Sequence, residues 1–166
     1  MQVSPVAVRL YLWNGEPLEA MFYLRPGDTA ADRVWESLGE RLNDPQTRFL
    51  ACRIAGHVEL LNVDAVAYVE VEGILPEVSQ EDTVGALRLA ATVSLRCGHS
   101  LAGEFLAILP PGRSRLSDLL SAPVERFLLF VDPFKTRYIR REAIDRVRPG
   151  DPLDELMVGL GAGAEG

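Results

Sequence analysis

Four side chains in the sequence carry the soft donor atoms that transition metals prefer: Cys52, His57, Cys97 and His99. Cys97 and His99 are two residues apart, so one short turn holds two of them. Cys52 alternates in phase with Leu50 along a predicted strand, which is typical of a buried thiol. The two Cys–His pairs also lie at non-equivalent places in the internal repeat described below. We therefore predict core or turn residues at these positions, no metal site and no disulfide framework.

Nucleophilic and acid–base chemistry need side chains in defined groups, and the sequence offers only weak candidates. Ser100 follows His99, but the flanking residues do not form a nucleophile elbow. Glu70 and Glu72 are two residues apart at the end of a strand, which is typical of a solvated face. No glycine-rich phosphate loop is present. We predict that the chain is not an enzyme, has no catalytic residues and needs no cofactor.

The one notable cluster of like charge is basic and lies late in the chain. With the tyrosine in its midst, the predicted binding surface comprises Lys135, Arg137, Tyr138, Arg140, Arg141, Arg146 and Arg148. A basic rim of this kind binds phosphate backbones, and Tyr138 with Phe134 would stack on bases if both are exposed. The competing interpretation is that the arginines meet acidic surface, within the chain or on a neighbouring protein. The second interpretation is favoured because a net charge of −7 repels a polyanion.

The elements that must position these residues are built twice. Residues 126–147 repeat residues 48–69 without a gap, at a spacing of 78 positions, and both copies open on Arg-Phe-Leu. An earlier block repeats as well, with Phe22 corresponding to Phe105. Internal repeats decide the whole interpretation of a fold. The sequence therefore predicts one small β unit that was duplicated and fused.

Each copy is predicted to hold five short strands with a helix between the second and third. Alternating apolar residues place the strands near 6–13, 18–24, 48–54, 58–62 and 66–71, and again near 92–97, 101–109, 126–131, 136–140 and 144–147. Helices are expected from Thr29 to Leu42, after a capping Ser114, and over residues 153–160.

Four segments are expected along the chain. They are a first barrel repeat at 1–73, a linker at 74–90, a second barrel repeat at 91–150 and an acidic tail at 151–166. Within the linker, residues 83–89 form either a short helix or the approach to the next strand. The tail is predicted to be a short helix followed by a disordered end.

Residues 60–69 and 138–147 resemble the second sequence motif of the Sm and Sm-like family, in which an apolar strand ends at a polar turn and an Ile- or Val-rich strand follows. Residues 8–22 and 93–105 resemble the first motif of that family. The resemblance implies a mainly β (α+β) chain with two tandem five-stranded SH3-like barrels. The residues with which the family holds uridine have no match, because the helical insert replaces them. The chain also resembles uncharacterised bacterial two-repeat proteins of this pattern.

The composition is that of a soluble globular protein, with 48% hydrophobic and 25% charged residues. No apolar run approaches the ~18 residues of a membrane span. The first residues lack the layout of a signal peptide, so we expect a cytoplasmic protein without membrane partners. Residues 1–91 hold 7 basic and 14 acidic side chains, residues 92–150 hold 10 basic and 6 acidic, and residues 151–166 hold 4 acidic. A basic second copy thus lies between two acidic segments.

Small barrels leave unpaired strand edges, and unpaired edges attract partner strands. Tandem copies are expected to pair edge to edge, and further pairing would give a homodimer or a ring. We therefore predict a non-catalytic protein-interaction or assembly module, whose partner is another copy of itself or another protein. The alternative prediction is binding of RNA or single-stranded nucleic acid through the basic rim of the second copy.

Overall fold

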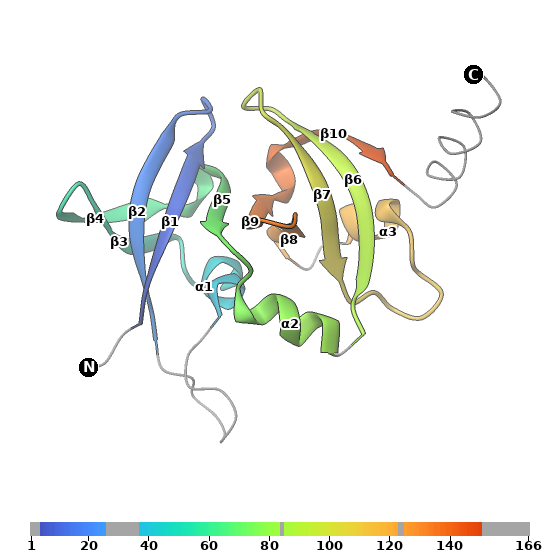
Figure 1. Ribbon diagram of the computed structural model, residues 1–166. Helices are drawn as coiled ribbons and strands as arrows, with labels where there is room; N and C mark the ends of the chain where they lie inside the picture. Colours follow the sequence, from blue (N-terminus) through green and yellow to red (C-terminus); the bar gives the residue numbers. More distant parts are fainter. Residues whose placement is uncertain (1–3, 26–36, 84, 123–124, 151–166) are drawn as a thin grey trace.

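The computed structural model describes residues 4–25, 37–83, 85–122 and 125–150, and shows a mainly β chain with short helices (Figure 1). The first half contains β1 (Ser4–Leu12), β2 (Pro17–Leu24), β3 (Phe49–Ile54), β4 (His57–Asn62) and β5 (Val66–Glu72). The second half contains β6 (Leu87–Leu95), β7 (Ser100–Ala107), β8 (Phe127–Val131), β9 (Lys135–Arg140) and β10 (Ile144–Pro149). The helices are α1 (Leu38–Asn43), α2 (Pro76–Thr83) and α3 (Leu116–Ser121).

The strands form one open antiparallel sheet in the order β10-β6-β7-β8-β9-β5-β1-β2-β3-β4. The first half has the order β5-β1-β2-β3-β4, and the second half has the corresponding order β10-β6-β7-β8-β9. The halves join where β5 pairs with β9, which is the edge-to-edge pairing expected from the sequence. As a result, β4 and β10 are the two edges of the sheet. The prediction of a mainly β chain with short helices is confirmed, and its strands continue across both halves.

The pairing register corresponds between the halves as well. β1 pairs with β5, and β6 pairs with β10, both antiparallel. Each pairing is interrupted by one register shift, at Ala67 in β5 and at Asp145 in β10. These two positions are separated by the same spacing as the sequence repeat, so even the local irregularity of the sheet follows the repeat.

The local sequence explains the strands and their turns. In β1, Val8 and Leu10 are buried while Arg9 between them is exposed, as expected for a strand with one face on a core. The β3–β4 hairpin has a two-residue turn in which Ala55 (φ 50°) and Gly56 (φ 82°) both take positive φ. That conformation matches a type I′ turn and fixes the register of the hairpin.

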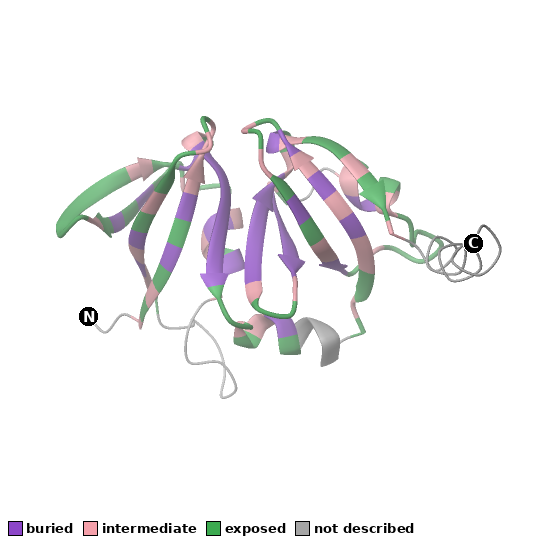
Figure 2. Ribbon diagram, turned by 45° about the horizontal axis from the view of Figure 1, so that its top comes forward, coloured by how far each residue is buried: buried purple, intermediate pink, exposed green. Residues whose placement is uncertain are grey.

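Two hydrophobic clusters form the core, and neither is confined to one half. The first includes Leu10 of the first half together with Phe127 and Tyr138 of the second. The second includes Phe105 of the second half together with Tyr68 of the first. Figure 2 shows the buried strands at the centre of the sheet and exposed residues along the β3–β4 hairpin at one end. Each cluster therefore extends across the boundary between the halves.

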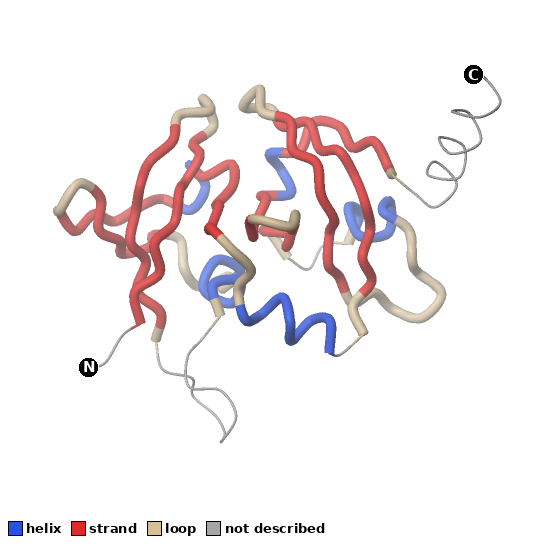
Figure 3. The backbone as a smooth tube through the Cα atoms, in the orientation of Figure 1, coloured by secondary structure: helices blue, strands red, loops and turns tan. Residues whose placement is uncertain are grey.

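α1 and α2 lie at the ends of the strands, beneath that boundary, whereas α3 lies within the second half (Figures 1 and 3). Leu38 and Leu42 of α1 are fully buried in the first cluster, which also holds Val78 of α2. α2 runs from the end of β5 to the start of β6 and so connects the two halves (Figures 1 and 3). Among the described residues, no helix is long and apolar enough to cross a membrane.

The segment between the halves, predicted as a linker, contains regular secondary structure. Of the two alternatives for residues 83–89, the structure shows the next strand, from Leu87 onward. Residues 74–90 contain α2 and the start of β6, which begins at Leu87 instead of Thr92. β6 pairs with β7 over its whole length, from Leu87 opposite Ala107 to Ser94 opposite Ser100. The long pairing with β7 explains why β6 starts earlier than its own apolar alternation indicates.

The predicted cap of α3 is also corrected. The helix follows Arg115, and the side chain of Asp118 accepts hydrogen bonds from the backbone nitrogens of Ser114 (3.2 Å) and Arg115 (3.0 Å). A carboxylate in the first turn thus does what the Ser114 hydroxyl was expected to do. The predicted start of the first helix, at residues 29–36, and the predicted helix of the acidic tail lie outside the described residues.

Candidate functional site: the junction of the halves and its free counterpart

The two halves meet at one strand pairing, which we call the internal junction. β5 runs antiparallel to β9 with Val69 opposite Tyr138 and Glu70 opposite Arg137. The backbone nitrogen of Gly73 donates to the oxygen of Phe134 just beyond this pairing, at 2.7 Å. Hydrogen-bonded pairs alternate along an antiparallel ladder, so the Val69–Tyr138 pair is one that exchanges backbone hydrogen bonds.

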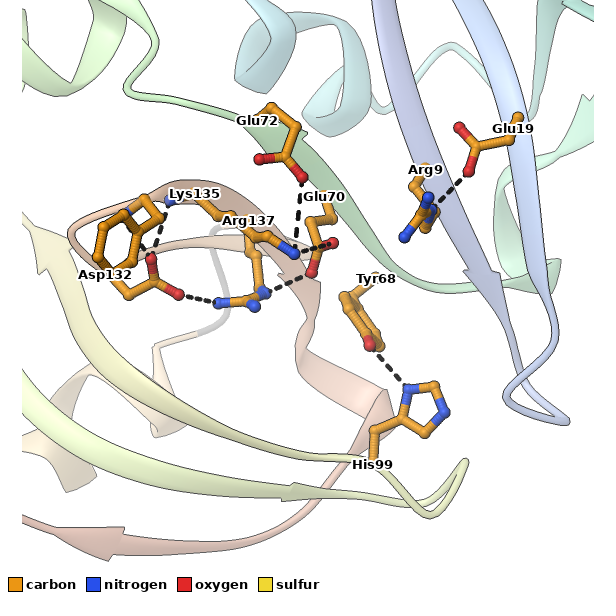
Figure 4. Close-up of polar contacts among 10 residues, drawn as sticks. Arg9, Glu19, Tyr68, Glu70, Glu72, His99, Asp132, Lys135 and Arg137 are labelled. Atoms are coloured by element: carbon orange, nitrogen blue, oxygen red, sulfur yellow. Dashed lines mark hydrogen bonds and ion pairs between the residues drawn. The ribbon is translucent and has the colours of Figure 1, made fainter.

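A buried carboxylate of the first half is neutralised at the internal junction by two cations of the second. Glu70 is only 5% exposed, and its Oε1 lies 3.0 Å from Nζ of Lys135 while its Oε2 lies 2.9 Å from Nε of Arg137. Arg137 reaches Oδ2 of Asp132 with its Nη1, at 2.7 Å (Figure 4). These contacts are charge-assisted and largely desolvated, which makes them dependent on one another.

The pKa values follow this geometry. Burial disfavours the charged form of Arg137, yet the hydrogen bonds from Asp132 and Glu70 outweigh burial and raise its pKa above the ordinary value. The hydrogen bond to Glu70 likewise raises the pKa of Lys135. Burial opposes ionisation of Asp132, but hydrogen bonds from the Phe134 nitrogen and from Arg137 lower its pKa overall. All these groups are therefore ionised at neutral pH.

α1 of the first half is held against the second half by polar contacts that saturate its end. The side chain of Asn43 donates to the Phe127 oxygen at 3.1 Å and accepts from the Phe127 nitrogen at 2.8 Å. Arg126 donates through Nε to the Leu42 oxygen at 2.7 Å. Glu77 of α2 accepts from the Gly39 nitrogen at 3.0 Å and from the hydroxyl of Tyr138. The carbonyl group of Leu42, near the end of the helix, is thus satisfied by an arginine of the other half.

Two other arginines of the predicted basic rim are used inside the protein. Arg140 is 5% exposed, lies over the Phe127 ring at 5.7 Å, and contacts Asp64 of the first half at 2.7 Å. Arg141 donates through Nη1 to the oxygens of Leu119 (2.6 Å) and Leu120 (2.8 Å) at the end of α3. One arginine ties the halves together, and the other caps a helix.

The seven predicted binding residues therefore do not form one exposed surface. Five of them make the internal contacts described above: Lys135, Arg137, Tyr138, Arg140 and Arg141. The remaining two, Arg146 and Arg148, are exposed on the edge strand β10. The ion pairs with Glu70 and Asp64 match the interpretation in which the arginines meet the acidic first half of the chain.

The internal junction also buries one face of the β8–β9 hairpin. This β8–β9 face consists of Phe127, Leu129, Val131, Thr136 and Tyr138. Phe127 and Thr136 are 0% exposed and Tyr138 is 5% exposed, because α1 and the first hydrophobic cluster cover them. A glycine is needed at position 39 of α1, where an added Cβ would lie 2.7 Å from the Tyr138 hydroxyl. The helix therefore packs directly onto this face.

The equivalent face in the first half is uncovered. The β3–β4 face consists of Phe49, Ala51, Arg53, Val58 and Leu60, each 78 positions before its counterpart on the β8–β9 face. Phe49 is 55% exposed, Val58 66% and Leu60 70%. These three form most of the exposed large hydrophobic side chains on the first half of the described chain. Val58 and Leu60 lie on the same face of β4, so the exposed apolar side chains are neighbours on the surface.

The sulfur and imidazole groups have structural roles. Cys52 is buried, and burial raises the pKa of its thiol, so it stays protonated. Burial also raises the pKa of Tyr68, so its hydroxyl stays protonated, and this hydroxyl shares a hydrogen bond with Nδ1 of His99 across the halves, at 2.7 Å. Tyr68 stacks on Tyr11 with ring centroids 4.3 Å apart. No group of three metal-binding side chains occurs among the described residues.

The pair Glu70 and Glu72 corrects a prediction. Glu72 is exposed as expected, with a side chain that is 79% accessible, but Glu70 is buried and lies among cations. No local pattern indicates this difference, because the partners of Glu70 lie on a strand 65 to 67 positions later in the chain. Only the spacing of the repeat, which brings β9 to β5 through equivalent edges, would have indicated it.

A cleft of about 980 Å³ lies beneath the internal junction, between α1, α3 and the segment after β7. Its walls are mostly apolar, with Leu109 and Pro110 on one side. Among the polar side chains in its lining, Glu77, Tyr138 and Arg141 are hydrogen-bonded within the protein. The described lining contains no histidine and no cysteine.

Comparison of the chain with protein-family models, with curated proteins and with solved structures found no match.

Proposed function

We propose that the protein is a non-catalytic assembly module, built from two tandem SH3-like units whose free edges bind further copies of the chain. One observation carries the proposal. The internal junction joins the β9 edge of one half to the β5 edge of the other, and it leaves the equivalent edges, β4 and β10, at the two ends of the sheet. The chain thus has two free strand edges, β4 and β10, that are equivalent to the β9 and β5 edges already paired within it.

The exposed apolar side chains support this proposal. Phe49, Val58 and Leu60 occupy positions whose counterparts are buried in the second half. Natural sheets protect their edges with charge, with proline or with a covering element. β4 has His57 and Glu59 on one face only, while its other face is apolar and accessible. An edge strand of this kind is expected to be covered by a protein in the functional state.

Nucleic-acid binding through the basic rim, the alternative prediction, has less support. Of the predicted residues, only Arg146 and Arg148 are exposed, and Arg146 lies 3.5 Å from the carboxylate of Asp145. Two arginines beside an acidic residue provide few contacts for a phosphate backbone. We therefore assign Arg146 and Arg148 to the assembly edge.

The molar mass in solution tests the proposal. By light scattering, the chain is expected to exceed its monomer mass of 18.3 kDa and to grow with concentration. A variant with Val58→Lys and Leu60→Lys should remain near the monomer mass at every concentration, because two cations then occupy the apolar face. Ala7→Lys with Ala102→Lys, both exposed on the interior strands β1 and β7, is the matched control and should assemble like the wild type. A wild-type chain that stays monomeric up to millimolar concentration would overturn the proposal.

A further inference from the structure

We infer that the chains join head to tail, with β4 of one copy paired to β10 of the next in the register of the internal junction. This inference rests on the proposed assembly function and adds to it the partner edge, the register and the residues that select them. A second possibility, two-fold pairing of like edges, predicts a different set of contacts. The charges on the two free edges distinguish the two arrangements.

The register follows from the internal junction by the spacing of the repeat. Internally, Tyr138 lies opposite Val69. The counterpart of Tyr138, 78 positions earlier, is Leu60 on β4, and the counterpart of Val69, 78 positions later, is Val147 on β10. Placing these two opposite each other brings an apolar pair to the centre of the new contact. It also uses the backbone groups of Leu60 that point away from β3, since the two-residue turn of the hairpin sets the alternation.

The same register brings together a pair of opposite charges. The internal pair of Glu70 with Arg137 corresponds to Arg148 on β10 and Glu59 on β4. The acidic residue is on β5 and the basic residue on β9 internally, whereas the basic residue is on β10 and the acidic residue on β4 at the free edges. The two charges of the pair are still opposite, so they attract each other. Glu59 and Arg148 are both exposed, and neither has an ion-pair partner within the described residues. A complementary charge pair on two otherwise unpaired edges is the signal expected of a selected contact.

A helix is also in place to cover the β3–β4 face. In the internal junction α1 covers the β8–β9 face with Leu38 and Leu42, both fully buried. Their counterparts in α3, Leu116 and Leu120, are only half-buried. In the head-to-tail arrangement, α3 of one copy lies over Phe49 of the next, as α1 lies over Phe127. The contact would thus bury half-covered leucines and exposed apolar residues together.

One feature of β10 weakens the contact relative to the internal junction. Val71, which pairs with Thr136 internally, is replaced in the repeat by Pro149, opposite Val58. Proline has no backbone N–H, so this position loses one ladder hydrogen bond while its carbonyl group can still accept one. The contact between chains is therefore expected to be reversible, whereas the internal junction is part of the fold.

Two-fold pairing of like edges places like charges together. In a β4–β4 pairing, the register that places Val58 of each copy opposite Leu60 of the other sets Glu59 directly opposite Glu59. In a β10–β10 pairing with Val147 opposite Val147 of the other copy, Arg146 lies opposite Arg148. In the pairing with Val147 opposite Pro149, Arg148 lies opposite Arg148. Like charges directly opposite each other destabilise strand pairs. Head-to-tail pairing avoids both conflicts, and repeated contacts of that kind close into rings or extend as filaments.

Charge reversal tests the inference. Glu59→Arg alone and Arg148→Glu alone should each weaken self-association at least about tenfold, the effect of removing a close interfacial charge pair. The double variant carrying both changes, and a one-to-one mixture of the two single variants, should recover the wild-type affinity to within about threefold. Both side chains are exposed, so circular dichroism and thermal unfolding should show unchanged folds.

The outcomes separate this inference from the proposed function. If the wild type never exceeds the monomer mass, the assembly proposal itself fails. If the wild type assembles but the single variants self-associate as strongly as the wild type, assembly stands and the head-to-tail register is overturned. The same holds if mixing the two single variants does not restore the affinity. Two-fold pairing through β4 would leave Arg148→Glu without effect, and mixing it with Glu59→Arg would strengthen association beyond either variant alone, because the introduced arginine of one chain then meets Glu59 of the other.

Discussion

Phe127 and Phe49 occupy the same position in the two halves, and their surroundings are opposite. Phe127 is 0% exposed beneath α1, while Phe49 is 55% exposed. The strands around them correspond in spacing and pairing register, so strand structure does not cause the difference. The difference arises because one hairpin face has a neighbour and the other lies at the end of the sheet. Burial in this protein is therefore decided by edge pairing, and each half is incomplete by itself.

The largest expected effect comes from removing the buried ring. Phe127→Ala should lower the free energy of unfolding by about 3–5 kcal/mol, because it leaves a cavity beneath α1. The matched change Phe49→Ala should alter the stability of the monomer by less than about 0.5 kcal/mol, as is usual at exposed positions. Urea unfolding at a concentration where the chain is monomeric gives both values. Equal losses in the two variants would show that the two faces are covered alike.

The next effect concerns the buried carboxylate. Glu70→Gln should lower the free energy of unfolding by about 3 kcal/mol, near the lower limit for removing one partner of a buried ion pair. The loss is near that limit because Arg137 still forms its ion pair with Asp132 in the variant. Glu72→Gln, two residues away and exposed, is the control and should be nearly silent. If both glutamine variants are equally stable, the internal junction does not depend on its charges.

A smaller effect is expected for the hydrogen bond between Tyr68 of β5 and His99 in the turn between β6 and β7. Tyr68→Phe removes the hydroxyl that bonds His99 and should cost about 1 kcal/mol, the usual net value of one such bond. Tyr23→Phe removes a hydroxyl that only accepts from exposed Arg53 and should be neutral. Thermal unfolding of both variants measures the difference. A larger loss from Tyr23→Phe would contradict the importance of contacts between the halves.

The smallest effect is a dependence on pH. The folded state lowers the pKa of Asp132, so its contribution to stability is present above the unfolded pKa and disappears as the pH falls through the folded value. The urea concentration at the unfolding midpoint should decrease once the pH is lowered below about 4, the ordinary range of an aspartate. Asp132→Asn should flatten this dependence on pH and lower the stability at neutral pH. The effect is limited because the Asp132 side chain is still 20% accessible. An unchanged pH profile in the variant would exclude Asp132 as its source.

Much of the secondary structure was predictable, because each strand carries its own alternation and each hairpin its own turn. Ala55-Gly56 and the spacing of 78 positions placed β4 and β9 correctly. α2 was misplaced because its residues, from Pro76 onward, lack a helical apolar stripe. Its position depends on burial of Val78 under the other half, which no local pattern reports.

The candidate site was less predictable than the strands. The sequence showed a cluster of arginines and left open whether they face nucleic acid or acidic protein. Arg137 and Arg140 are buried because Glu70 and Asp64 meet them from 67 and 76 positions away. Charge along one strand does not reveal which strand lies beside it. The repeat was the informative feature, since it identifies which edges are equivalent.

Hydrogen exchange at the backbone amides of Val58 and Leu60 tests the central claim most directly. Both amides point away from β3, so they are open in the monomer and paired in the assembly. We predict that they exchange rapidly in dilute solution and slowly in concentrated solution, while the corresponding amides of Thr136 and Tyr138 are protected in both. Equally rapid exchange of Val58 and Leu60 at both concentrations, in a sample that has nonetheless assembled, would contradict edge pairing at β4.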